Sequence, residues 1–66
     1  MTENLPRLLT TGEVLQALRI GRTSLYQLVI DGELPKPIKL GSKSLWLESD
    51  VTKYLHDRIA EREVTL

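Results

Sequence analysis

The stretch GRTSLYQLVIDG, from Gly21 to Gly32, decides how this chain is expected to fold. At 100° per residue, Leu25, Leu28 and Val29 fall on one side of a helix, and Thr23 and Gln27 lie nearly opposite. One side of this helix is therefore expected to pack against a core, while the other presents hydroxyl and amide groups to solvent.

Both ends of this helix carry sequence signals. Gly21 can serve as its amino-terminal cap, and the helix is expected to run from Arg22 to Asp31. Gly32 fits the left-handed position that follows a helix, Leu34 can fold back onto the apolar side, and Pro35 prevents continuation.

The preceding segment predicts a first helix. Thr10 and Glu13 have the spacing of a capping box, in which the hydroxyl accepts from the amide of Glu13 and the carboxylate accepts from that of Thr10. This helix is expected to end near Arg19, and Ile20-Gly21 supplies a turn that joins two helices at a steep angle. Together they predict a helix-turn-helix, and a plain helical hairpin is the alternative.

The following segment predicts a β-hairpin. Residues 36–40 alternate polar and apolar, residues 43–47 are rich in strand formers, and the tip falls near Gly41 to Lys43. We expect Ile38 and Leu40 to face the helices, with either Leu45 and Leu47 or Trp46 beside them. Such a hairpin next to a groove-reading helix would be a wing; a structural hairpin whose lysines aid solubility is the alternative.

A third helix, starting at Glu48 or Ser49, completes the expected fold. Its apolar stripe consists of Val51, Tyr54, Leu55 and Ile59, and its role is scaffolding. The fold class is mainly α with a small β-hairpin, a winged helix-turn-helix of order α-α-β-β-α. We expect one domain over residues 7–62, with residues 1–6 and 63–66 frayed.

The charge is unevenly distributed, although nine basic and nine acidic residues cancel. Residues 19–43 hold five basic residues and two acidic ones, which leaves +3. A local patch matters more than the total, because salt screens exposed charges beyond roughly 8–10 Å.

Composition argues against several classes of protein. The chain has no cysteine and a single histidine, His56, so we expect no metal site, no cofactor and no disulfide. We expect no enzyme and no small-molecule substrate, since there is no glycine-rich phosphate loop and little chain to enclose a pocket. No apolar run is long enough to cross a bilayer, and the amino terminus lacks a leader pattern, so a cytoplasmic location without membrane contact is expected.

The order of several short segments resembles the AlpA family of prophage regulators, which is related to excisionases and to the DNA-binding domain of MerR proteins. The segments are LLTTGEVL at Leu8 to Leu15, GRTSLY at Gly21 to Tyr26, GELPKPIKLG at Gly32 to Gly41, and WLESDV at Trp46 to Val51. Members often have a serine at the position of Gly21 and a basic residue at that of Leu45, and the second departure weakens the wing assignment more. The resemblance covers about residues 7 to 60 and implies a non-catalytic regulator of prophage genes that binds DNA.

The expected DNA-binding residues combine this resemblance with the exposed helix face and the basic middle segment. Gln can pair with adenine and Arg with guanine in the major groove, while Lys and hydroxyl groups contact phosphates. The candidates are Arg19, Arg22, Thr23, Ser24, Tyr26, Gln27, Lys36, Lys39, Ser42 and Lys43.

Two alternatives stay open beside a transcriptional regulator. The first is an excision factor that bends attachment-site DNA, with double-stranded DNA, an integrase or a second copy on adjacent sites as partners. The second is a small protein-interaction module that inhibits another regulator, using the exposed helix face or an apolar patch around Ile30 and Trp46.

Overall fold

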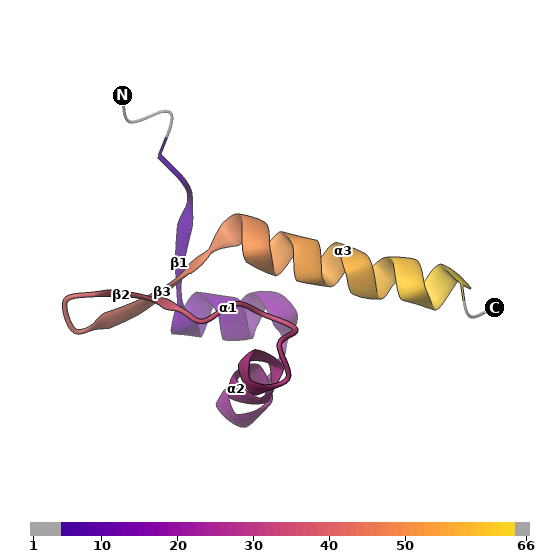
Figure 1. The fold of residues 1–66 in the computed structure, drawn as a ribbon, viewed down its shortest axis with the longest axis horizontal. Coiled ribbons are helices and arrows are strands. Elements are labelled where there is room, and N and C mark those ends of the chain that lie inside the picture. Colours follow the sequence, from indigo (N-terminus) through magenta and orange to yellow (C-terminus); the bar gives the residue numbers. More distant parts are fainter. Residues whose placement is uncertain (1–4, 65–66) are drawn as a thin grey trace.

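The computed structural model describes residues 5–64, with the side chains of residues 5–62. The fold consists of three helices and a small antiparallel sheet whose hairpin, residues 38–47, projects to one side of the helices (Figure 1). In chain order the elements are β1 (Leu8–Thr10), α1 (Thr11–Leu18), α2 (Arg22–Ile30), β2 (Ile38–Leu40), β3 (Lys43–Leu47) and α3 (Glu48–Val64). The expected helices and hairpin are confirmed, and the order differs by one added strand, β1.

The amino end of α1 carries the predicted capping box. The Thr10 hydroxyl accepts from the Glu13 amide at 3.1 Å, and Glu13 Oε1 accepts from the Thr10 amide at 2.8 Å. The helix ends at Arg19, whose amide donates to the Leu15 carbonyl with the backbone in the left-handed region, at φ 59°. Both boundaries of α1 therefore agree with the sequence pattern.

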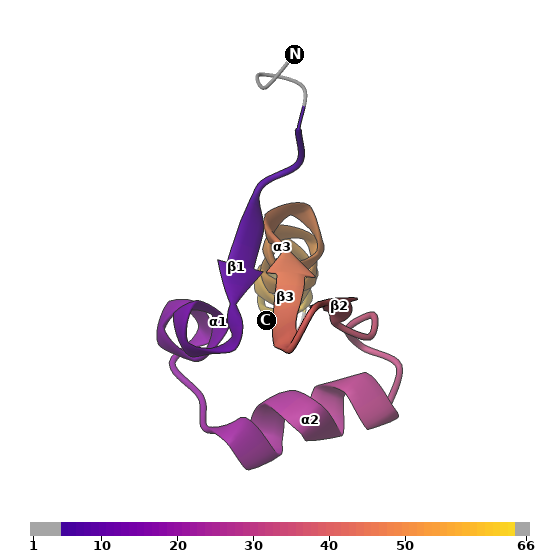
Figure 2. The same ribbon diagram turned by 90° about the vertical axis from the view of Figure 1, so that its left-hand side faces the viewer.

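Helix α2 crosses α1 steeply, as the two helices of a helix-turn-helix do. Figure 1 shows α1 along its length and α2 nearly end-on, and Figure 2 shows the reverse. Gly21 caps α2 in an extended conformation, and Gly32, at φ 80°, follows its last turn. The Leu34 amide then donates to the Leu28 carbonyl, which returns the buried Leu34 side chain to the core.

The sheet has three strands, in the order β1-β3-β2, where the sequence pattern predicted only two. Strand β1 pairs with β3 so that Leu9 lies opposite Trp46, and β2 pairs with β3 so that Lys39 lies opposite Ser44. The expectation of a two-stranded hairpin leaning on the helices is corrected accordingly: the segment just before α1 forms an edge strand.

The two faces of the sheet differ, and this corrects a second expectation. Trp46 is 3% exposed and faces the helices, whereas Ile38 and Leu40 are 39% and 52% exposed. Because side chains alternate along a strand and paired residues share a face, Ile38 and its partner Leu45 lie on the face opposite Trp46. Ile38 and Leu40 therefore do not face the helices, and the burial of Trp46 also removes it from the proposed apolar interaction patch.

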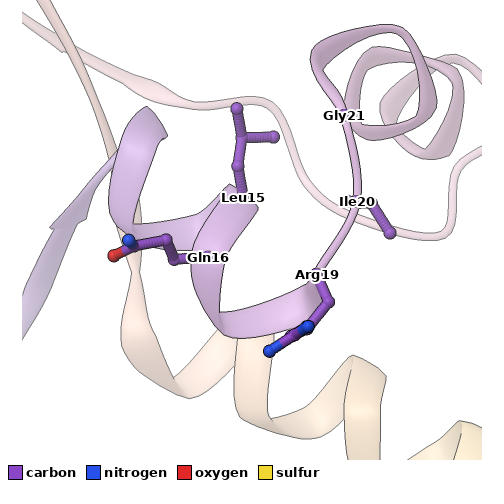
Figure 3. Close-up of a pocket in the computed structure, with 5 residues that line it drawn as sticks. All are labelled: Leu15, Gln16, Arg19, Ile20 and Gly21. Atoms are coloured by element: carbon purple, nitrogen blue, oxygen red, sulfur yellow. The ribbon is translucent and has the colours of Figure 1, made fainter.

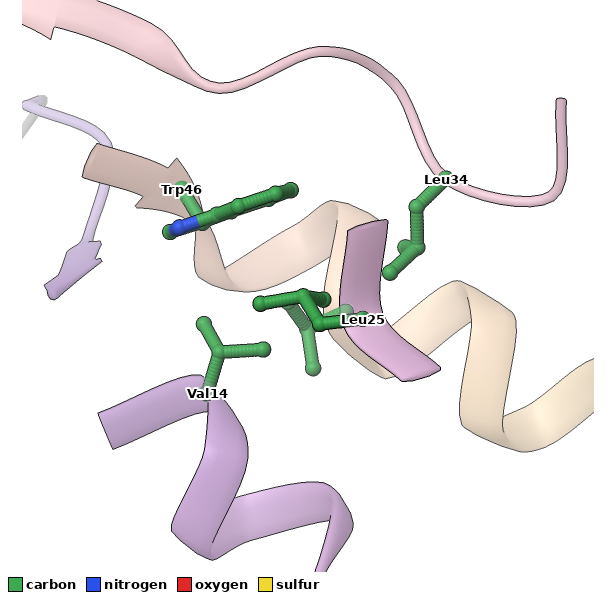
Figure 4. Close-up of a cluster of buried hydrophobic side chains, with 5 residues drawn as sticks. Val14, Leu25, Leu34 and Trp46 are labelled. Atoms are coloured by element: carbon green, nitrogen blue, oxygen red, sulfur yellow. The ribbon is translucent and has the colours of Figure 1, made fainter. Parts of the chain in front are cut away.

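The core lies between the sheet and the helices. Figure 4 shows side chains from α1, α2, the loop after α2 and β3 converging on one space. Trp46 Nε1 also donates to the Thr11 hydroxyl at 3.1 Å, which joins the first turn of α1 to the middle strand. The buried members are Val14, Leu25, Leu34, Trp46 and Val51.

Helix α3 is only partly covered. It starts at Glu48, as expected, and Val51 and Tyr54 pack against the core. Leu55 and Ile59, expected in the buried stripe, are 42% and 41% exposed because α3 extends past the other helices (Figure 1). No helix within residues 5–64 is long and apolar enough to span a membrane.

The predicted domain, residues 7–62, lies within the described residues, whereas the two chain ends that flank it lie partly outside them. Residues 1–4 and 65–66 are not described, so the expectation of frayed ends is not tested there. Near the amino end, Arg7 is anchored to the start of α3. Its carbonyl accepts a hydrogen bond from the Glu48 amide at 2.9 Å, and its guanidinium lies 3.6 Å from the Glu48 carboxylate.

Candidate nucleic-acid interface

The outward side of α2 is fully presented to solvent. Leu25 is buried and Leu28 and Val29 are half-buried, which confirms the predicted packing side. Thr23, Ser24, Tyr26 and Gln27 are all exposed on the remaining surface. Figure 2 shows α2 lying across the edge of the molecule, with the sheet, α1 and α3 all to one side of it. This helix can therefore enter a groove without rearrangement.

The Gln27 amide is held by a neighbouring carboxylate. Its Nε2 donates to Asp31 Oδ1 at 3.0 Å, one helical turn further on. A side-chain amide has two N–H groups, so Oε1 and one N–H remain available. These are the acceptor and the donor needed to pair with N6 and N7 of adenine. The spacing of four residues between Gln27 and Asp31 is the sequence signal that could have indicated this contact.

The amino end of α2 favours an anion. Gly21 contributes no side-chain hydrogen bond to the cap, and the first turn contains no acidic residue. Arg22, Thr23 and Ser24 are exposed in that turn, so a cation and two hydroxyl groups lie at the positive end of the helix dipole. A backbone phosphate fits this chemistry, since phosphates bind at helix amino termini through backbone N–H groups.

The hairpin tip has the expected composition. The turn between β2 and β3 consists of Gly41, at φ 62°, and Ser42. Lys39 lies opposite Ser44 on the sheet face that carries Trp46, which is the face toward α1 and α2. Lys43 lies opposite Leu40 on the other face. Of the two strand lysines, Lys39 is therefore the one on the side of α2.

Arg19 lies apart from the outward face of α2. Figure 3 shows its guanidinium directed away from Gly21, beside Gln16 of α1. It lines a hollow of about 440 Å³ together with Leu15, Gln16, Ile20 and Gly21. Arg19 therefore lies beside the turn that leads into α2, with its guanidinium directed away from the cap residue Gly21.

Lys36 lies away from the hairpin tip, just before strand β2. It lines a second hollow, of about 390 Å³, between the loop after α2 and α3. Three carboxylates, those of Glu33, Asp50 and Asp57, line the same hollow, together with Lys53, which is paired with Asp57. A cation among acidic side chains is less available to a phosphate than one at the hairpin tip, because its positive potential is partly offset.

Helix α3 carries two exposed ion pairs on its surface. Lys53 donates to Asp57 at 2.8 Å, and this hydrogen bond raises the pKa of Lys53 above its ordinary value of 10.5. Arg58 pairs with Glu61 at 2.9 Å. Within residues 5–64, no group of three side chains is placed to hold a metal ion. These pairs give α3 an outer surface of mixed charge.

Comparison with known proteins gives two matches. The family model described as prophage CP4-57 regulatory protein (AlpA) matches residues 7–59. An uncharacterized protein of Enterobacteria phage P4, ORF88, is 38% identical over 58 residues, which are 86% of this chain and 66% of that protein. The chain thus spans just under two thirds of the phage protein. No solved structure matches it.

Proposed function

The chain belongs to the AlpA family of prophage regulatory proteins, and from that membership we propose that it binds double-stranded DNA sequence-specifically and regulates prophage genes. In this proposal α2 enters the major groove, and the hairpin formed by β2 and β3 contacts the backbone or the minor groove as a wing.

The observation that carries the proposal is the outward face of α2. Thr23 and Gln27 are exposed side by side, and the Gln27 amide is oriented by Asp31 with its oxygen free. Such a contact also occurs on ordinary solvated helices. What supports base reading is that it leaves one donor and the acceptor of the amide exposed on the outward face. Arg22 at the start of the helix and Lys39 in the hairpin add cations on the same side of the molecule.

A salt titration of DNA binding tests the electrostatic part of this proposal. If Arg22, Lys39 and Lys43 each contact a phosphate, log affinity falls with log salt at a slope near −2.7, from about −0.9 per contact. Contacts from Arg19 and Lys36 as well would bring the slope to about −4.5. The slope therefore also reports whether Arg19 and Lys36 contact phosphates.

The matched control for this titration is Arg58→Gln on α3. It removes the same charge as Lys39→Gln, but from a helix on which no contact is proposed. Lys39→Gln is expected to reduce the slope by about 0.9, and Arg58→Gln to leave it unchanged. Equal effects of the two substitutions, or binding that does not depend on salt, would contradict the proposed interface.

A gel-shift series distinguishes a regulator from an excision factor. The probes cover the upstream DNA and the attachment site of a neighbouring integrase gene. A single shifted band on upstream DNA supports a regulator, whereas a ladder of bands with bend-dependent mobility on the attachment site supports an excision factor. A stoichiometric protein partner in nuclease-treated lysate, with no affinity for either probe, would replace both with the interaction module.

A further inference from the structure

Ile30 is the most exposed of the large hydrophobic side chains in residues 5–62, at 76%. It occupies the last turn of α2 and lies on the outward face, not on the face that packs. Seven residues separate it from Thr23, so the two positions differ by only about 20° around the helix. Thr23, Gln27 and Ile30 therefore form one outward row along α2.

The spacing of this row is slightly more than one base-pair step. Ile30 follows Gln27 by three residues, which is about 4.5 Å along the helix axis. Successive base pairs lie about 3.4 Å apart along the duplex. If Gln27 faces one base pair, Ile30 is then placed at the next one.

Only one base-edge group in the major groove is apolar, and it is the 5-methyl of thymine. Ile30 offers no hydrogen-bond donor or acceptor on its side chain, so no other base edge gains from contact with it. On the basis of the proposed DNA binding, we infer that Ile30 contacts a thymine methyl and sets a preference for thymine next to the base pair read by Gln27.

The neighbouring charges are compatible with this contact. Asp31, the acidic residue adjacent to Ile30, accepts the hydrogen bond from Gln27 and so is partly engaged. Ile30 lies outside the core cluster and its packed neighbours, so its exposed side chain is not needed to hold α2 in place. A truncation at this position therefore changes the outward surface while the fold is retained.

The test removes the thymine methyl from the DNA and, independently, the apolar side chain of Ile30 from the protein. A site is first selected with the wild-type chain from a randomised duplex library. Thymine at the position in question is then replaced by uracil, which lacks only the 5-methyl. Wild-type affinity is expected to fall about four-fold, the effect of one buried carbon, and Ile30→Ala is expected to bind both duplexes equally.

Gln27→Ala is the matched control, because it changes the same face but leaves Ile30. It is expected to lose the adenine preference and to keep the four-fold response to uracil. Unfolding midpoints of the three chains are expected to coincide, which separates loss of contact from loss of fold.

Two results would overturn the inference while leaving DNA binding in place. One is a wild-type chain that binds thymine and uracil duplexes equally, and the other is an Ile30→Ala chain that still responds to the methyl. Failure of the wild-type chain to select any duplex is a different outcome, because it removes the proposed function and this inference with it.

Discussion

Arg19 adopts a backbone conformation that few residues with a side chain favour. Its φ of 59° lies in the left-handed region, which costs roughly 1–2 kcal/mol for a residue other than glycine. The sequence predicted the turn through Ile20-Gly21 and the cap of α2 at Gly21, and both are confirmed. The left-handed residue of this turn is Arg19, which the pattern did not indicate. The pattern located the turn and could not tell which residue would take the strained conformation.

Arg19→Gly is expected to stabilise the fold by about 1 kcal/mol, because glycine adopts positive φ without steric cost. Urea unfolding measures this change. Arg19→Ala serves as the control, since it removes the same charge but keeps a Cβ. If Arg19 contacts a phosphate, both variants lower the salt slope of DNA binding by about 0.9. Equal stability of the two variants would show that the left-handed conformation does not limit the fold.

Asp31 is expected to act on specificity through Gln27. Asp31→Ala removes the hydrogen bond that orients the amide, so discrimination at the base pair read by Gln27 is expected to fall about three- to ten-fold. It also removes a negative charge near DNA, so affinity for random duplexes is expected to rise. Asp31→Asn keeps an acceptor for the amide and is expected to raise random affinity without losing discrimination. Loss of discrimination in both variants would show that the charge, and not the hydrogen bond, matters.

At the level of elements, the sequence predicted those whose boundaries carry local signals. The capping box placed the start of α1, and Gly32 with Pro35 placed the end of α2. Strand β1 has no such signal: it is three residues long and is defined by pairing with β3, about 35 residues away. The same residues are equally compatible with an irregular segment that leads into the cap of α1. The strand could therefore not be found from periodicity.

Thr10 serves two elements at once, because it ends β1 and caps α1. Thr10→Ala is expected to lower the free energy of unfolding by about 1 kcal/mol through loss of the cap. Thr10→Ser retains the hydroxyl and is expected to stay within a few tenths of a kcal/mol of wild type. Thermal unfolding followed by circular dichroism gives both values. A serine variant as unstable as the alanine variant would assign the effect to the strand instead of the cap.

For the whole molecule, the sequence predicted the order of the helices and the hairpin, but neither strand β1 nor which face of the sheet is buried. Leucines and isoleucines occupy one face of the hairpin, and Trp46 faces the other way. Burial of either face was compatible with the alternation of polar and apolar residues. In the structure the buried face is the one that carries Trp46. The exposed and packed sides of α2 were correctly predicted, since they follow from helical periodicity alone. The positions of Arg19 and Lys36 depend on tertiary packing and could not be foreseen.

Trp46 is expected to decide whether the domain folds at all. Trp46→Ala removes a buried ring at a cost of about 3–5 kcal/mol, and a single core of this size supplies about the same total. The variant is therefore expected to be largely unfolded at 25 °C by circular dichroism. Trp46→Phe keeps most of the buried area but loses the hydrogen bond to Thr11, and is expected to fold with a lower midpoint. A folded alanine variant would show that the core does not depend on this ring.

The most direct measurement is the base preference of Gln27→Ala beside that of the wild-type chain. Both are titrated against a selected duplex and against duplexes that carry each of the other three base pairs at the position assigned to Gln27. The wild-type chain is expected to favour its own base pair by about 5- to 150-fold, or roughly 1–3 kcal/mol. Gln27→Ala is expected to bind all four alike and to keep its preferences elsewhere. A variant that retains the full wild-type preference would contradict the placement of α2 in the major groove.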